Sequence, residues 1–129
     1  MATIFTKIIN GEIPSYKIAE NENYLAFLDV SPLQKGHTLI VPKQEVDYIF
    51  DVQDDVLAEM MLFAKQVAKK IKTSISCNRI GVAVIGLEVP HAHIHLIPIN
   101  KMDDMNFANK KLELSKEQFK EIQRDIVKQ

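Results

Sequence analysis

The sequence predicts one α+β domain built on an antiparallel sheet, and three patterns lead to this prediction. Short apolar segments stand before and after a single long stretch with helical spacing, and a second helical stretch ends the chain. The order strands, helix, strands, helix is typical of an α+β domain. A chain of 129 residues can bury one core, and no linker or repeat divides it, so we expect a single domain over 1–129.

The first strands are expected between Ile18 and Val30. The turn residues "ENEN" at 20–23 separate an extended segment from the apolar run "YLAFLDV" at 24–30, which is a pattern typical of a hairpin. A third strand, "HTLIVP" at 37–42, follows the turn residues Lys35 and Gly36. These segments predict the first half of the sheet.

Two helices are predicted from apolar spacing. From about Val52 to Lys72, apolar residues recur at intervals of three and four, which draws one stripe along a helix. Core packing explains the methionines and the phenylalanine of that stripe. Near the end of the chain, Ser115 and Gln118 have the spacing of a capping box, and the apolar residues that follow line one side of a helix over about 115–128.

Between the helices, "RIGVAVIGL" at 79–87 predicts a strand buried on both faces, and "HAHIHLIPI" at 91–99 predicts a strand with two chemically different faces. Successive side chains of a strand point to opposite faces, so His91, His93 and His95 share one face while apolar residues cover the other. The apolar face packs on the core. The imidazoles therefore line a cleft or solvent, and chemistry is expected there.

Three explanations remain for these histidines. Zinc is one, because histidines at i and i+2 can share an ion. Positions i and i+4, however, lie roughly 13 Å apart along a strand, so all three histidines cannot easily bind the same ion. Neutral imidazole, with a pKa near ~6.5, can instead attack phosphorus or donate to phosphate oxygens. A structural role as hydrogen-bonded, partly buried histidines is the third. We expect phosphate chemistry with no metal or cofactor. The other residues that could ligate zinc are not spaced like a metal-binding motif; they are Asp29, His37, Cys77 and Glu88.

Composition excludes several classes of partner. The net charge is -1 and the lysines are spread along the chain, so an extended nucleic acid is not expected. The longest apolar run, "IGVAVIGL", is far shorter than the ~20 residues that span a bilayer, so no membrane association is expected. Cys77 is the only cysteine and "MATIFTKIING" does not resemble a secretory signal; we expect a cytoplasmic protein.

The segment "HAHIHLIP" matches the pattern His-φ-His-φ-His-φ-φ of the histidine triad (HIT) superfamily of nucleotide hydrolases and transferases. The stretches "IFTKIINGEIP", "YLAFLDVSPLQKGHTLIVPK" and "GLEVPHAHIHLIP" resemble the successive blocks of that family in the right order, over about 4–98. The resemblance implies a HIT-like fold with a five-stranded antiparallel sheet, a long central helix and a C-terminal helix. It also implies a homodimer and a purine nucleotide bound with its α-phosphate at the triad.

The resemblance also implies a role for each matching residue. His93 becomes the nucleophile that forms a covalent nucleotidyl-histidine intermediate, and His95 and His37 contact phosphate oxygens or the leaving group. His91 supports this arrangement from behind, and Asp29 binds the ribose hydroxyls. The remaining substrate-binding positions, of which the apolar ones could equally be plain core, are Ile4, Phe5, Ile8, Phe27, Val30, Leu39, Glu88 and Val89.

Two departures from the family pattern affect the interpretation. Many relatives carry two cysteines and a further histidine that hold a structural zinc, but Thr3, Thr6 and Glu45 stand at those positions here. That zinc site is therefore expected to be absent. The loop before the triad is shorter than usual, with Leu87 where glutamine is common and Glu88 where a leaving-group ligand falls. The loop therefore does not identify the leaving group.

The activity that the resemblance implies is that of the phosphoramidase-like, or Hint-like, branch. Such an enzyme cleaves the α-phosphate bond of purine nucleoside phosphoramidates or related nucleotide conjugates. A dinucleoside polyphosphate hydrolase is the first alternative. A nucleotide-binding regulatory module with little turnover is the second.

Overall fold

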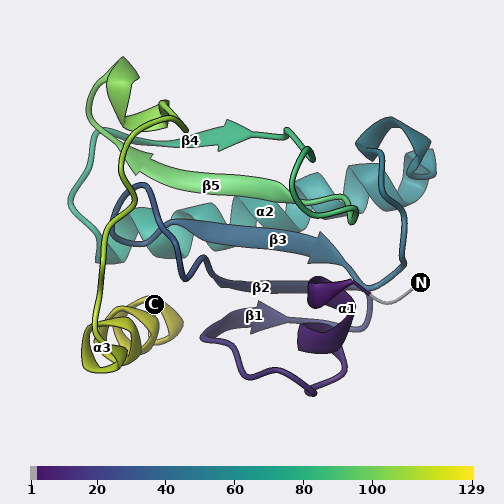
Figure 1. The fold of residues 1–129 in the computed structure, drawn as a ribbon, viewed down its shortest axis with the longest axis horizontal. Helices are drawn as coiled ribbons and strands as arrows, with labels where there is room; N and C mark the ends of the chain where they lie inside the picture. Colours follow the sequence, from purple (N-terminus) through teal and green to yellow (C-terminus); the bar gives the residue numbers. More distant parts are fainter. Residues whose placement is uncertain (1–2) are drawn as a thin grey trace.

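Five antiparallel strands form one sheet in the order β1-β2-β3-β5-β4, in a computed structural model that describes residues 3–129. Figure 1 shows this sheet with one long helix behind it and a short helix in front. The α+β class and the five-stranded antiparallel sheet predicted from the sequence are confirmed. The strands are β1 (Lys17–Glu20), β2 (Tyr24–Leu28), β3 (Thr38–Pro42), β4 (Arg79–Ala83) and β5 (Ile94–Ile99).

The long helix α2 (Asp54–Ser74) covers the back of the sheet (Figure 1). It begins two residues later than predicted, because a short 3-10 turn, η1 (Ile49–Asp51), and the extended Val52 precede it. The predicted apolar stripe faces the core, where α2 packs on strand residues such as Ile40 and Leu96. The buried residues of α2 are Met60, Phe63, Ala64, Val67 and Ile71.

The last helix, α3 (Lys116–Val127), begins with the predicted capping box. The Ser115 hydroxyl accepts from the Gln118 backbone N–H at 3.1 Å, and the Gln118 side chain accepts from the Ser115 N–H at 2.8 Å. Such a box satisfies two backbone donors that the first turn leaves free. The apolar side of α3 then joins the same core as α2. A second 3-10 turn, η2 (Met102–Met105), lies between β5 and α3.

The front of the sheet carries a smaller apolar cluster and the candidate site. The short helix α1 (Ile4–Ile9) lies over this face (Figure 1) and packs Phe5 against Phe27 and Leu39. Alternation along the strands separates the two faces, because Leu39 and its neighbour Ile40 belong to different clusters. No helix of the residues from 3 to 129 is long and apolar enough to cross a membrane.

The predicted strand over 79–87 is shorter and more exposed than expected. It ends at Ala83, and β4 is an edge strand with one neighbour. Val82, Val84 and Ile85 are 41–48% exposed, so the prediction of burial on both faces is wrong for the single chain. An apolar run does not distinguish a strand at the centre of a sheet from one at its edge with a single neighbouring strand.

The predicted strand over 91–99 begins later than expected. β5 starts at Ile94, so His91 and His93 precede the strand and only His95 lies within it. Hydrogen bonds to the segment around the end of β3 hold the preceding residues instead: Ala92 N–H donates to the Val46 carbonyl at 2.7 Å. The alternation that the sequence predicts continues through these residues, since Ala92 and Ile94 are both buried.

Gly36 is required at the turn that places His37 at the start of β3. Its φ is +90°, a region that favours glycine, and an added Cβ would overlap the terminal methyl group of Ile75. The turn therefore depends on a residue without a side chain. Gly11 has a similar φ of +79° but no atom within 4 Å of an added Cβ.

We predict that Gly36→Ala destabilises the protein by about 2–4 kcal/mol, because the strained backbone costs about 1–3 kcal/mol and the contact with Ile75 adds to it. Gly11→Ala is the matched control and should cost only the backbone part. Urea unfolding of both variants measures the difference. Equal losses of unfolding free energy would show that the contact with Ile75 does not constrain the turn.

Candidate active site

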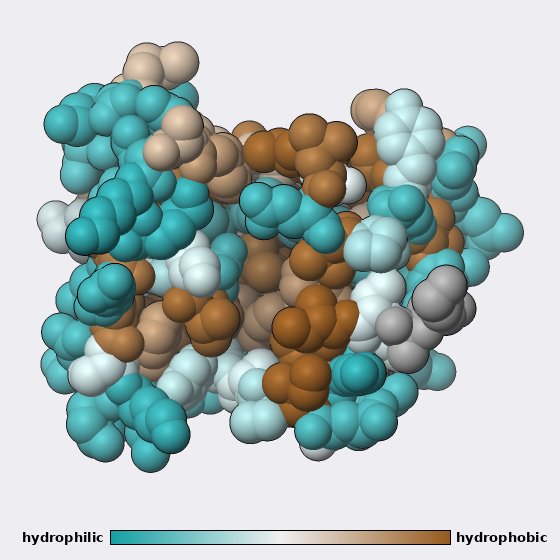
Figure 2. Space-filling view, in the orientation of Figure 1, coloured by the Kyte–Doolittle hydropathy of each residue, from teal (hydrophilic) through white to brown (hydrophobic). Residues whose placement is uncertain are grey.

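A cavity of about 440 Å³ opens on the front of the sheet, within the size range of small-molecule sites. The end of β2, the start of β3, β5, α1 and the loop before the triad contribute to its walls. Figure 2 shows this face as a hollow with hydrophobic residues on its floor and both hydrophilic and hydrophobic residues around it. The predicted site residues that line it are Ile4, Phe5, Asp29, His37, Leu39, Glu88, Val89, His93 and His95.

Four predicted site residues lie outside the cavity lining. Phe27 is buried in the apolar cluster of the front face, and Ile8 packs against that cluster. Val30 is 65% exposed. His91 is fully buried and lies outside the lining. The apolar pattern could not distinguish residues that touch the cavity from those that support it, because both are apolar.

Sequence reasoning missed six further lining residues. Three of them come from the shortened loop, whose length departs from the family pattern. Phe107 and Lys111 come from an irregular polar segment after η2, which carries no motif that could have drawn attention to it. The full set is Ser31, Ile85, Gly86, Leu87, Phe107 and Lys111.

Hydrogen bonding fixes the proton of His93. Its Nδ1 lies 2.7 Å from the His91 carbonyl oxygen, and a carbonyl can only accept, so Nδ1 carries the proton. The Nε2 atom is therefore the one with a free lone pair. Burial lowers the pKa of His93, although the bond to the His91 carbonyl opposes this effect. His93 is thus a neutral imidazole at neutral pH.

A backbone N–H fixes the protons of His37 and His95. The Leu33 N–H donates to His37 Nδ1 at 3.0 Å, so the proton of a neutral His37 resides on Nε2. That Nε2 lies 2.9 Å from His95 Nδ1 and donates to it. His95 then carries its own proton on Nε2. The side chain of His95 therefore offers an N–H donor to a ligand in the cavity.

Burial keeps both of these histidines neutral. It lowers the pKa of His37 to about 3, with the neighbouring His95 and Lys111 adding to the effect. Burial likewise lowers the pKa of His95 to about 4, with a further contribution from His93. Neutrality agrees with the hydrogen bonds, because a doubly protonated His37 would present a donor to the Leu33 N–H.

Asp29 stands beside this pair at the end of β2. One of its carboxylate oxygens accepts from the Ser31 N–H at 2.8 Å, and the other lies 3.6 Å from His37 Nε2. Burial raises the pKa of Asp29, while the Ser31 hydrogen bond and the charge of Lys111 lower it. The turn thus holds an acceptor group at the cavity wall, where it can bind hydroxyl groups of a ligand.

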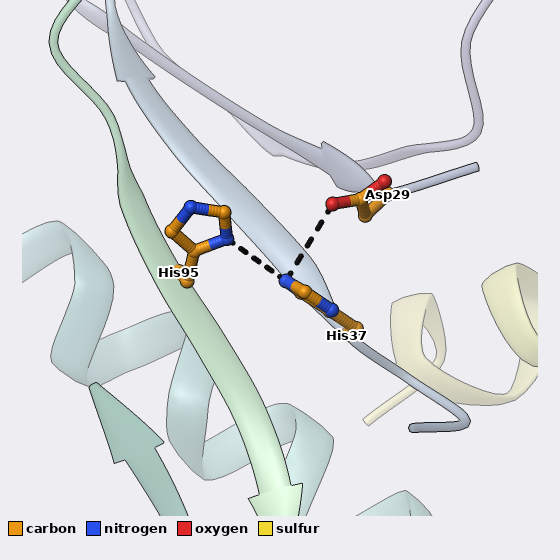
Figure 3. A group of neighbouring side chains, drawn as sticks. All are labelled: Asp29, His37 and His95. Carbon is orange, nitrogen blue, oxygen red and sulfur yellow. Dashed lines mark hydrogen bonds and ion pairs between the residues drawn. The ribbon is translucent and has the colours of Figure 1, made fainter. Parts of the chain in front are cut away.

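The fold brings Asp29, His37 and His95 close enough to consider a metal site, although they come from three separate strands or strand ends (Figure 3). Their ligand atoms all lie within 4.8 Å of one another, and sequence spacing did not reveal this cluster. His37 could ligate through Nε2 only if its proton moved to Nδ1, opposite the Leu33 N–H. An unsatisfied buried donor costs about 1–3 kcal/mol. A metal ion at this cluster would therefore have to offset the loss of the hydrogen bond between the Leu33 N–H and His37.

A second hydrogen-bonded group, which includes Thr3 and His91, lies behind His93. His91 Nε2 donates to the Pro42 carbonyl at 2.8 Å, so its Nδ1 accepts from the Thr3 hydroxyl at 3.3 Å. The Thr6 hydroxyl donates to the Glu45 carboxylate. His91 therefore connects the N-cap of α1 to the end of β3, and its own carbonyl orients His93.

These pKa shifts predict acid sensitivity. Unfolded histidines titrate near pH 6.5, whereas the pKa of folded His37 is about 3 and that of His95 about 4. Between those values the unfolded chain binds more protons, so stability is greatest above pH 6.5 and falls as the pH falls. Each histidine contributes a slope of about 1.4 kcal/mol per pH unit. The raised pKa of Asp29 acts in the opposite sense at lower pH.

We therefore expect the unfolding free energy to fall by about 2–3 kcal/mol per pH unit between about pH 6 and 5. The double variant His37→Asn, His95→Asn should show a much shallower slope in the same interval, whatever its absolute stability. Urea unfolding at a series of pH values measures both slopes. An equal slope in the variant would contradict the assignment of neutral His37 and His95.

Sequence comparisons find relatives over most of the chain. The model of the HIT domain matches residues 10–102. An uncharacterized HIT-like protein of Borreliella burgdorferi is 37% identical, with 95% of this chain and 94% of that protein aligned. The adenosine 5'-monophosphoramidase HNT1 of Saccharomyces cerevisiae is 41% identical over 75% of this chain and 62% of its own length.

Solved structures share the fold. A HIT-like protein of Bartonella henselae, described as involved in cell-cycle regulation, superimposes with a TM-score of 0.85 at 27% identity, over 98% of this chain and 94% of the other. A zinc-bound histidine triad family protein of Mycobacterium smegmatis gives a TM-score of 0.82 at 25% identity, over 99% and 95% of the two chains. The likeness extends through the C-terminal helix.

Proposed function

We propose, because the chain belongs to the HIT domain family, that it is a nucleotide hydrolase or nucleotidyltransferase. Its substrates are purine nucleoside phosphoramidates or related nucleotide conjugates, and it cleaves the bond between the α-phosphate and the leaving group. The monophosphoramidase among its relatives supports this substrate class. The reaction proceeds through a nucleotide covalently bound to His93.

The observation that carries the proposal is the fixed proton of His93. With Nδ1 donating to the His91 carbonyl at 2.7 Å, the lone pair of Nε2 is free on a side chain that lines the cavity. The lowered pKa of His93 keeps that lone pair unprotonated below the usual histidine range. A nucleophile held in one tautomer and one orientation avoids the entropic cost of finding both.

The proposed chemistry has two displacement steps. The Nε2 lone pair of His93 forms a bond to the α-phosphorus while the bond to the leaving nitrogen breaks, and that nitrogen takes up the electron pair and a proton from solvent. Water then attacks the same phosphorus and loses a proton to solvent, the bond to Nε2 breaks, and the imidazole regains its lone pair. The products are a nucleoside monophosphate and an amine. The N–H of His95 stabilises the phosphate oxygens in both steps.

The remaining walls suit the rest of a nucleotide. Asp29 provides an acceptor for ribose hydroxyls, held in place by the Ser31 N–H. Apolar side chains from α1 and β3, including Phe5 and Leu39, line the same cavity and provide a flat surface for a purine base. Phe5 also contacts His93 edge to face, with ring centroids 5.0 Å apart, so the base surface and the nucleophile are joined directly.

We predict that His93→Ala lowers kcat for an adenosine phosphoramidate by about 1000-fold or more, while AMP affinity stays within about tenfold. His91→Ala should cost less, because the carbonyl that orients His93 belongs to the backbone and remains. Steady-state kinetics and calorimetric titration measure the two effects. Wild-type activity in His93→Ala would refute the mechanism.

A substrate panel distinguishes the proposal from other activities. An adenosine phosphoramidate, a diadenosine polyphosphate and a sugar nucleotide are compared by kcat/KM. Rapid quench with substrate labelled at the α-phosphate, followed by peptide mapping, locates the adduct. Label on a peptide without His93 would contradict the covalent intermediate.

We also propose that the chain forms a homodimer through β4. This edge strand presents unpaired backbone groups and exposed apolar side chains such as Val82, and Figure 2 shows an apolar patch along the upper part of the front face. An edge with this character is usually paired or covered. A second copy of the chain would pair with it and extend the sheet.

We expect sedimentation at micromolar concentration to give about twice the chain mass of 14.7 kDa. Val82→Lys should shift the protein toward the monomer, because a charge at the paired edge loses its solvation. Val127→Lys, at an exposed apolar position on α3, is the control and should leave the dimer intact. A wild-type monomer at high concentration would rule out this assembly.

A further inference from the structure

The segment from Asn106 to Leu112 crosses the front of the sheet between η2 and α3, and Figure 1 shows it passing over the ends of β5 and β3. The Leu112 N–H donates to the Pro32 carbonyl at 2.8 Å, which ties the segment to the β2–β3 connection. Phe107 packs edge to face on His95 with ring centroids 4.9 Å apart. This segment lies beyond residues 10–102, which the HIT domain model matches.

Lys111 reaches the cavity from this segment. Its ammonium donates to the Phe107 carbonyl at 2.6 Å and to the Asn109 carbonyl at 3.1 Å, and its side chain lines the cavity. An ammonium has three N–H donors, so these bonds leave one. Both partners are uncharged, so they hold the ammonium in place without neutralising it.

The cavity has little other positive charge. Among the lining residues within 3–129, Lys111 is the only lysine or arginine, whereas Asp29 and Glu88 are acidic. The hydrogen bonds of His37 and His95 hold those two imidazoles neutral, as shown above. The charge of Lys111 acts on the side of the cavity formed by Asp29 and His37, since it lowers the pKa of both residues. A phosphate in this cavity therefore needs a cation that the histidines do not supply.

We propose that Lys111 is a substrate-binding residue whose remaining ammonium N–H pairs with the anionic phosphate of the bound nucleotide. This inference rests on the proposed function and extends it to a residue outside the matched domain. The two carbonyls position the charge before the substrate arrives. Lys111 thereby lets the site bind a phosphate anion while its histidines stay neutral enough for nucleophilic attack.

The experiment compares the affinities of AMP and adenosine, which differ by the phosphate. Lys111→Met removes the charge and keeps the length of the side chain. It should weaken AMP binding by about 10–100-fold, the effect of losing a hydrogen bond to a charged group, and change adenosine binding less than about twofold. Lys111→Arg should retain most of the preference for AMP. Lys110→Met, at the exposed neighbouring lysine, is the matched control and should bind both ligands like the wild type.

Calorimetric titration at low and high salt separates the outcomes. The proposal is supported if Lys111→Met loses AMP affinity while Lys110→Met does not. High salt should also weaken AMP binding by the wild type. Equal losses of affinity for AMP and adenosine would mean that Lys111 only holds the segment in place, and this result would overturn the proposal. Unchanged AMP binding in Lys111→Met would also overturn it. A wild-type protein that binds neither ligand would overturn the proposed function itself, and this inference with it.

Discussion

One hydrogen bond, from the Leu33 N–H to His37 Nδ1, determines the proton positions on which the site depends. Because a backbone amide can only donate, His37 must carry its proton on Nε2, and His95 must then accept at Nδ1 and expose its own N–H. The order of donors and acceptors is thus set by main chain rather than by a titratable group. The same bond opposes metal binding by His37, since a metal at Nε2 would leave the amide without an acceptor.

Because side chains alternate along β3 and β5, one face of the sheet packs in the hydrophobic core while the other face lines the cavity. Ile40 and Ile94 face α2 and complete the larger core, while Leu39 and His95 face the cavity. Each reactive residue is therefore backed by close-packed apolar neighbours on the other side of the same strand. Such packing restricts the rotation of the imidazoles, which a site with fixed tautomers requires.

The periodicity of apolar residues predicted the helices and the sheet, because burial of one face imposes that periodicity. It could not predict which strand lies at the edge of the sheet or which polar residues line the cavity. The apolar run at 79–87 predicts a buried strand, yet Val82 lies at an open edge, because the sequence does not say which strand is last in a sheet. The cluster of Asp29, His37 and His95 could not be predicted from sequence spacing, because its members come together only through strand pairing. Lys111 was missed because a lysine in a polar segment has the same appearance whether it faces solvent or a cavity.

His91 shows how one buried polar residue can connect three segments of the fold. It contacts the N-cap of α1 through Thr3, the end of β3 through the Pro42 carbonyl, and His93 through its own carbonyl. Hydrogen bonds of this kind contribute about 1 kcal/mol each, much less than a structural zinc contributes. The attachment of α1 must therefore depend mainly on the packing of Phe5 against Phe27 and His93. The ring of Phe5 that faces the cavity is thus also the one that keeps α1 on the sheet.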